Sequence, residues 1–122
     1  MRLMHSLGHH DIWQWHFQYN DHSLLYSLYG NYHTHESKFV FGPKWGEYKG
    51  GDRKMQALMQ GYWLNFVLYG NPNGAEGRLR MEDDLHWDPA SPDGVMVFQK
   101  ESQMEDLVFP KHCDFFDRVP PA

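Results

Sequence analysis

The 122-residue chain has little cysteine, few basic residues and no long apolar run, and each shortage excludes a class of protein. Its one cysteine, Cys113, cannot form a disulfide within the chain and is too few for the common zinc motifs. No segment approaches the run of about 18 apolar residues that a membrane-spanning helix needs. The 11 basic residues face 16 acidic ones, and a net charge of -5 argues against a general nucleic-acid-binding protein.

The chain also lacks the motifs of a complete active site. None of its serines stands in the Gly-x-Ser-x-Gly setting that exposes a nucleophile on a sharp strand-to-helix turn, and no glycine-rich phosphate loop is present. The nine histidines include His9-His10 and the pair His33 and His35, but a metal centre needs three or four converging ligands. We therefore predict no metal site and no cofactor, and local chemistry alone identifies no active site.

Aromatic residues, in contrast, are abundant and make up 16% of the chain. Between residues 13 and 19 they alternate with polar residues, and this period of two predicts a strand with one aromatic face. Shorter signals predict a loop or helical turn over 24–32 and strands over 95–99 and 104–109. Residues 39–41 are expected to form a brief strand or the wall of a pocket, and 110–116 a short final helix.

The clearest helix is predicted from Arg53 to Leu68. Its apolar residues recur every three or four positions and form one stripe: Met55, Leu58, Met59, Tyr62, Trp63, Phe66 and Val67. We expect Asp52 to be the N-cap, because its carboxylate can accept hydrogen bonds from free backbone N–H groups. Gly70 is expected to end the helix in a left-handed conformation. Such a helix needs a larger sheet than three or four short strands, so the chain is expected to be the end of a larger domain.

Four motifs, in order along nearly the whole chain, resemble the C-terminal part of a type-B carboxylesterase or cholinesterase. After an aromatic strand, that family carries its catalytic histidine in a loop of the pattern His-Gly-x-Glu-(Ile/Leu)-x-Phe-(Val/Ile)-Phe-Gly. Residues 33–42 read His-Thr-His-Glu-Ser-Lys-Phe-Val-Phe-Gly, with six positions in register. The other similarities are Trp-Leu-Asn-Phe at 63–66 with Gly-Asn-Pro-Asn at 70–73, His-Trp-Asp-Pro at 86–89 with Val-Met-Val-Phe at 95–98, and Cys-Asp-Phe-Phe-Asp at 113–117.

The resemblance implies an α/β fold in which residues 1–122 are the C-terminal part of a single α/β-hydrolase domain whose N-terminal part is missing. This part would contain the last strands, the catalytic-histidine loop, a long amphipathic helix, a terminal strand and a short helix. In such enzymes the serine, the acid and the histidine follow in that order, so a C-terminal part holds only the histidine. By resemblance His33 is the general base and acid, and Glu36 and Thr34 support its loop.

The implied activity is hydrolysis of small-molecule carboxylic esters through an acyl-serine, without a cofactor, in the intact parent chain. The 122 residues alone are expected to be inactive because they lack the nucleophile and the oxyanion hole. The expected partners are the ester substrate and the remainder of the parent chain, with no nucleic acid and no membrane span.

Several alternatives stay open at this point. His35 is the rival base, although it falls on a variable position of the pattern, and Glu36 is a less favoured candidate for the acid. Thr34 stands where the family has glycine, so an inactive adhesion or scaffold protein, or a truncated product, is the alternative to an esterase. Cys113 is either a free thiol or bonded to the missing part, and a disulfide there would accord with the secretory pathway that the resemblance allows.

Overall fold

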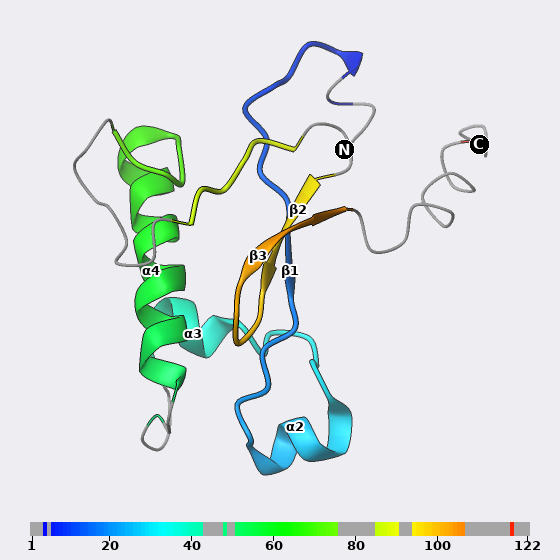
Figure 1. Ribbon diagram of the computed structural model, residues 1–122, viewed down its shortest axis with the longest axis vertical. Helices are drawn as coiled ribbons and strands as arrows, with labels where there is room; N and C mark the ends of the chain where they lie inside the picture. Colours follow the sequence, from blue (N-terminus) through cyan, green and yellow to red (C-terminus); the bar gives the residue numbers. More distant parts are fainter. Residues whose placement is uncertain are drawn as a thin grey trace.

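A computed structural model describes residues 4, 6–42, 48, 51–75, 85–90, 94–106 and 118. These residues form, in chain order, β1 (Trp15–Phe17), α2 (Leu24–Tyr29), α3 (Ser37–Phe41), α4 (Asp52–Tyr69), β2 (Gly94–Phe98) and β3 (Gln103–Asp106). Figure 1 shows α4 beside the three strands and α2 beyond the carboxyl end of β1. In the described part of the chain, no helix has the length and apolar character needed to cross a membrane.

The three strands form one mixed sheet in the order β1-β2-β3. β1 and β2 are parallel, with Trp15 opposite Met96, whereas β2 and β3 are antiparallel. The central strand is buried on both faces, since residues 95–98 are each at most 1% exposed. A strand covered on both sides has no polar face, which explains why Val-Met-Val-Phe is a continuous apolar run rather than an alternating one.

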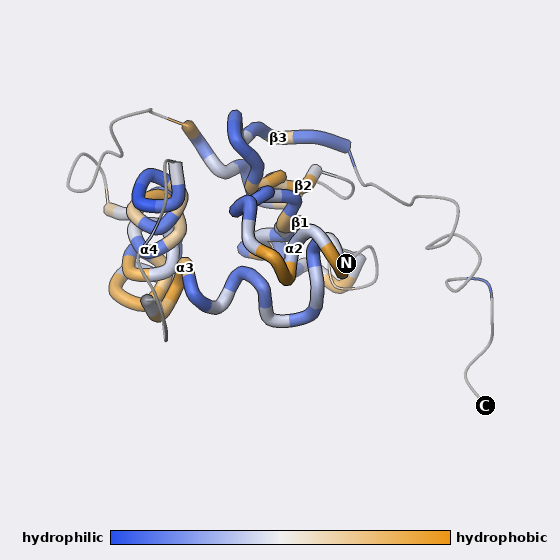
Figure 2. The backbone as a smooth tube through the Cα atoms, turned by 90° about the horizontal axis from the view of Figure 1, so that it is seen from below, coloured by the Kyte–Doolittle hydropathy of each residue, from blue (hydrophilic) through white to orange (hydrophobic). Residues whose placement is uncertain are grey.

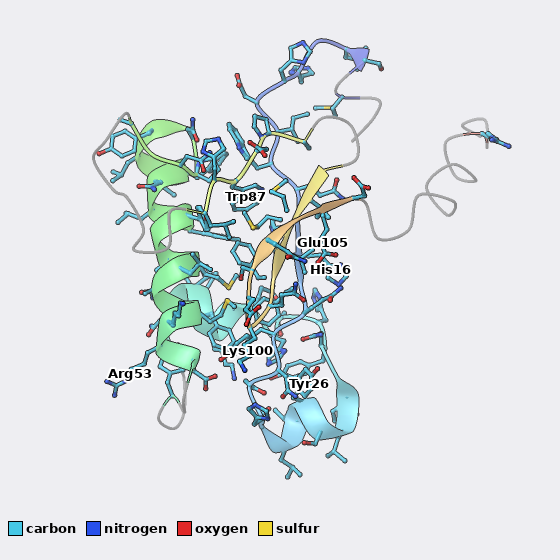
Figure 3. All side chains as sticks on the ribbon, viewed as in Figure 1. His16, Tyr26, Arg53, Trp87, Lys100 and Glu105 are labelled. Atoms are coloured by element: carbon cyan, nitrogen blue, oxygen red, sulfur yellow. The ribbon has the colours of Figure 1, made fainter. Side chains whose placement is uncertain are left out.

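The main core lies between α4 and the sheet. Seen from below, α4 and the strands form separate layers (Figure 2), and the side chain of Trp87 fills the space between them (Figure 3). The ring centroid of Trp87 lies 5.3 Å from that of Tyr62 on α4 and 5.5 Å from that of Phe98 on β2. His16 and Glu105 lie on the side of the sheet turned away from α4 (Figure 3). The helix α4 therefore packs on this sheet through aromatic side chains.

The long helix confirms the prediction except at its beginning. Gly51 is the N-cap and Asp52 is the first helical residue, so the prediction that Asp52 caps the helix is wrong by one position. A carboxylate in the first turn is still favoured by the helix dipole. At the other end, Gly70 adopts φ 67° and donates its N–H to the Phe66 carbonyl oxygen at 2.8 Å, as expected for a left-handed cap.

The apolar stripe of α4 is buried only in its first half among the described residues. Met55, Met59 and Tyr62 are at most 3% exposed, but Phe66 is 50% and Val67 is 77% exposed. The second half of the stripe is therefore only partly covered within the described part of the chain, where the Phe66 ring meets Trp13 at a centroid distance of 5.8 Å.

The short elements differ more from the predictions. Residues 39–41 belong to the helix α3, and the strand alternative is wrong: Phe39 is fully buried whereas Phe41 is 84% exposed, although a strand would turn both to one face. β1 contains three residues of the predicted seven, because only Trp15–Phe17 pair with β2. The expected final helix over 110–116 and Cys113 lie outside the described residues.

Candidate active site

His33 lies in the turn that joins α2 to α3, and its side chain is exposed. The turn follows the carboxyl end of β1, which is the end of parallel strands at which α/β proteins place their ligands. Among the described residues, the His33 imidazole has no acid partner, and Glu36 does not provide one. The Glu36 backbone carbonyl instead accepts hydrogen bonds from the N–H groups of Phe39 at 2.9 Å and Val40 at 3.3 Å, which begins α3.

Thr34 has a left-handed backbone with φ 70°, which is rare for a β-branched residue. This conformation separates the two histidines of the turn, because His33 is exposed whereas His35 is 1% exposed. The position is thus one for which glycine is well suited, yet the loop adopts the positive φ with threonine.

His35 is enclosed by aromatic rings. Its imidazole stacks on Tyr32 at a centroid distance of 4.6 Å and meets the edge of Phe17 at 5.2 Å. Its Nε2 lies 3.2 Å from Asp21 Oδ2, although neither ring nitrogen makes an aligned hydrogen bond. A general base must approach the proton it removes to about 2.6–3.2 Å, so an enclosed imidazole is poorly placed for this role. Of the two imidazoles of the turn, that of His33 is the one exposed to solvent.

The Asp21 carboxylate joins three parts of the site. Its side chain is 1% exposed, its Oδ1 accepts a hydrogen bond from the Ser23 N–H at 3.0 Å, and its Oδ2 pairs with the Lys38 ammonium group. Burial alone would raise the pKa of Asp21, but the hydrogen bonds from Lys38 and Ser23, together with the nearby His35 imidazole, outweigh it and hold that pKa well below its usual range. Asp21 is therefore a buried anion with several donors.

Comparison with protein families adds one decisive finding. Residues 1–116 match the profile described as the carboxylesterase family. The chain belongs to the carboxylesterase family. No curated protein gives a significant match. Membership supports an α/β-hydrolase fold and ester hydrolysis at the level of the family, with small-molecule esters as the substrate class.

The helix α3 anchors the histidine turn of this carboxylesterase-family chain to α4. The Tyr48 hydroxyl donates to the Lys38 carbonyl oxygen at 2.5 Å, and Gln60 Nε2 donates to the Val40 carbonyl oxygen at 3.1 Å. Phe39, which stands between Lys38 and Val40 in the chain, is fully buried. The turn therefore ends on a helix whose Phe39 belongs to the main core, whereas α2, on which it begins, has no buried residue.

Asp21 and Lys38 are the residues of the site that the sequence analysis missed. A signal was present: Asp21 and Ser23 form an Asx-type turn, and the Ser23 hydroxyl accepts from the Tyr26 N–H at 3.0 Å as the N-cap of α2. From the sequence alone, residues 20–23 are expected only to end the aromatic strand pattern.

The described part of this family member contains no group of three or more His, Cys, Asp or Glu side chains that could hold a metal ion. A cavity of about 490 Å³ lies at the same end of the sheet, between the segment after β1, the beginning of α4 and the turn after β2. Tyr19, Lys54, Lys100 and Ser102 are among the residues that line it, and His33 is not. The candidate base thus points to the surface rather than into this cavity.

Proposed function

We propose that this chain supplies the general base, His33, to a serine esterase that hydrolyses small carboxylic esters. The observation that carries the proposal is the contrast between an exposed His33 and an enclosed His35 on the two sides of Thr34, in a chain of the carboxylesterase family.

In the proposed reaction, one ring nitrogen of His33 accepts the proton of the serine hydroxyl as its oxygen attacks the ester carbonyl carbon. The same nitrogen returns that proton to the leaving alcohol when the acyl-serine forms, and the sequence repeats with water. The other ring nitrogen donates to a carboxylate, which keeps the imidazole in the required tautomer. The serine, this carboxylate and the oxyanion hole come from outside residues 1–122.

We further propose that residues 1–122 act as the C-terminal part of one esterase domain. Two features support this division. The second half of α4 exposes an apolar surface: Leu64 (52%), Phe66 (50%), Val67 (77%) and Leu68 (57%). Among the described strands, β1 also pairs on one edge only. Exposed apolar surface and an unpaired edge both need a cover, which the remainder of the parent chain would provide.

The direct test compares the intact parent chain with its His33→Ala variant in hydrolysis of a short-chain aryl ester. Loss of the base is expected to lower kcat by at least about 10³-fold, as removal of a triad member does in serine hydrolases. His9→Ala is the matched control, because His9 is also exposed but lies before β1. Equal turnover by the parent and His33→Ala would refute the assignment.

An inactive adhesion or scaffold protein is the second candidate, and the departure at Thr34 is its basis. The positive φ of Thr34 weakens that argument, since the loop retains the backbone that glycine would give it. A parent chain without serine at the Gly-x-Ser-x-Gly position would instead favour the scaffold.

A further inference from the structure

We propose that Asp21 is a positioning residue for His33 and holds the histidine turn in place through His35 and Lys38. The inference rests on the proposed role of His33 as the base.

The first step is the place of Asp21 in the chain. It follows β1 by four positions and precedes α2, so it stands where the chain leaves the sheet. From there its carboxylate contacts the Ser23 N–H at the beginning of α2, the His35 imidazole after the turn and the Lys38 ammonium group on α3. The buried Asp21 carboxylate thus brings Ser23, His35 and Lys38 together. His33 lies two residues before His35 in the chain.

The second step is the backbone connection between His35 and His33. The His35 N–H donates to the Tyr32 carbonyl oxygen at 3.1 Å, and the Ser37 N–H donates to the Thr34 carbonyl oxygen at 3.0 Å. These two bonds fix the backbone on both sides of His33. With Thr34 held in its left-handed conformation, the orientation of the His33 side chain depends on the position of the His35 ring.

The position of the His35 ring depends in turn on its contact with the Asp21 carboxylate. Aromatic rings of Tyr26, Tyr32, Phe17 and Phe39 surround the imidazole with centroid distances of 4.6 to 6.2 Å. Figure 3 shows Tyr26 projecting from α2 toward the strands. These rings fill the space but offer His35 no anion, so among the described residues Asp21 supplies the charge that meets its Nε2.

The third step is the role of Lys38. Its side chain is 29% exposed, and its ammonium group pairs with Asp21 and lies 4.8 Å from the centroid of the buried Phe39 ring. A buried carboxylate is tolerated only when it has charge-matched donors. The Lys38 pair therefore holds Asp21 ionised, and it also connects the first turn of α3 to the segment between β1 and α2.

The experiment uses the full-length gene product and two readouts, namely steady-state hydrolysis of p-nitrophenyl acetate and the rate at which diethyl pyrocarbonate modifies each histidine. Asp21→Asn is expected to lower kcat by about 10- to 100-fold with little change in KM, the cost of misplacing a catalytic group by about 1 Å. His35, enclosed in the parent, is expected to become reactive several times faster.

The matched control is Asp88→Asn. Asp88 Oδ1 lies 3.6 Å from His86 Nε2, but both side chains are 64% exposed, so this pair repeats the Asp–His contact without its burial. Neither kcat nor the reactivity of His35 is expected to change in this variant.

If Asp21→Asn fails to fold, Lys38→Met provides the same test, since it removes the charge and keeps most of the apolar stem. Lys38→Met is expected to lower kcat, and Lys38→Arg to restore most of it. A folded Asp21→Asn or Lys38→Met protein with parental kcat and an unreactive His35 would overturn the inference. Full activity in His33→Ala would instead refute the proposed function. In that case the reactivity of His35 in Asp21→Asn would still show whether Asp21 holds the His35 ring in place.

Discussion

Replacing Thr34 by glycine is expected to stabilise the chain, because Thr34 adopts φ 70°. A left-handed backbone costs a residue with a Cβ about 1–2 kcal/mol, and glycine does not have this cost. Glycine also gains freedom in the unfolded chain, which offsets about 0.5–1 kcal/mol of the benefit. The Thr34 side chain is exposed and makes no hydrogen bond to another described residue, so no lost contact enters the balance.

The net gain is therefore about 0.5–1 kcal/mol in the free energy of unfolding, or about 2–5 °C in Tm for a protein of this size. Urea unfolding and thermal melting of Thr34→Gly beside the parent measure it. Thr34→Ala is expected to change stability little, because alanine retains the Cβ. Asn31→Gly, in the same turn but without a positive φ, is expected to lose about 0.5–1 kcal/mol. Equal losses in Thr34→Gly and Asn31→Gly would refute the reasoning.

Two further predictions concern contacts away from the turn. Asn73→Ala is expected to lower the free energy of unfolding by about 2–3 kcal/mol, since the Asn73 amide bonds both the N–H and the carbonyl of Trp87 at 2.8 Å. A loss under about 1 kcal/mol in urea titrations would contradict this. Burial, and then the charge and hydrogen bond of Asp52, raise the pKa of Tyr19 from 10.0 to about 12. The folded state keeps a proton that the unfolded state releases, so stability falls as the pH rises through this range, by about 1 kcal/mol near pH 11. Tyr19→Phe is expected to remove that part of the decline. If the stability curves of Tyr19→Phe and the parent were parallel from about pH 9 to 11, this contribution of Tyr19 would be excluded.

The sequence was sufficient for the elements whose signals are local and long. The helix α4 repeats its apolar stripe over several turns and ends at a glycine, and each of these features acts within a few residues. The strands β2 and β3 are apolar or alternating runs bounded by turn residues. Their predicted positions agree with the structure to within one or two residues at the described ends.

The sequence was insufficient where tertiary contacts decide the conformation. The helix α3 has five residues, too few for a periodic signal, and burial of Phe39 without Phe41 is visible only after folding. The contacts of Asp21 reach 14 and 17 positions along the chain, to His35 and Lys38, and nothing in the local pattern predicts them. Local chemistry also could not separate His33 from His35, and only the family resemblance ranked them.

The parallel pairing of β1 and β2 also has a consequence for the order of folding. Trp15 and Met96 lie opposite one another but are 81 positions apart in the chain. α4 can form from local contacts as soon as it is synthesised, whereas the sheet must wait for residues 94–98. Pairing over such a separation slows folding, and in the interval the aromatic residues of β1 and α4 have no strand to cover them. A nascent chain halted before residue 94 is therefore expected to depend on chaperones to avoid aggregation.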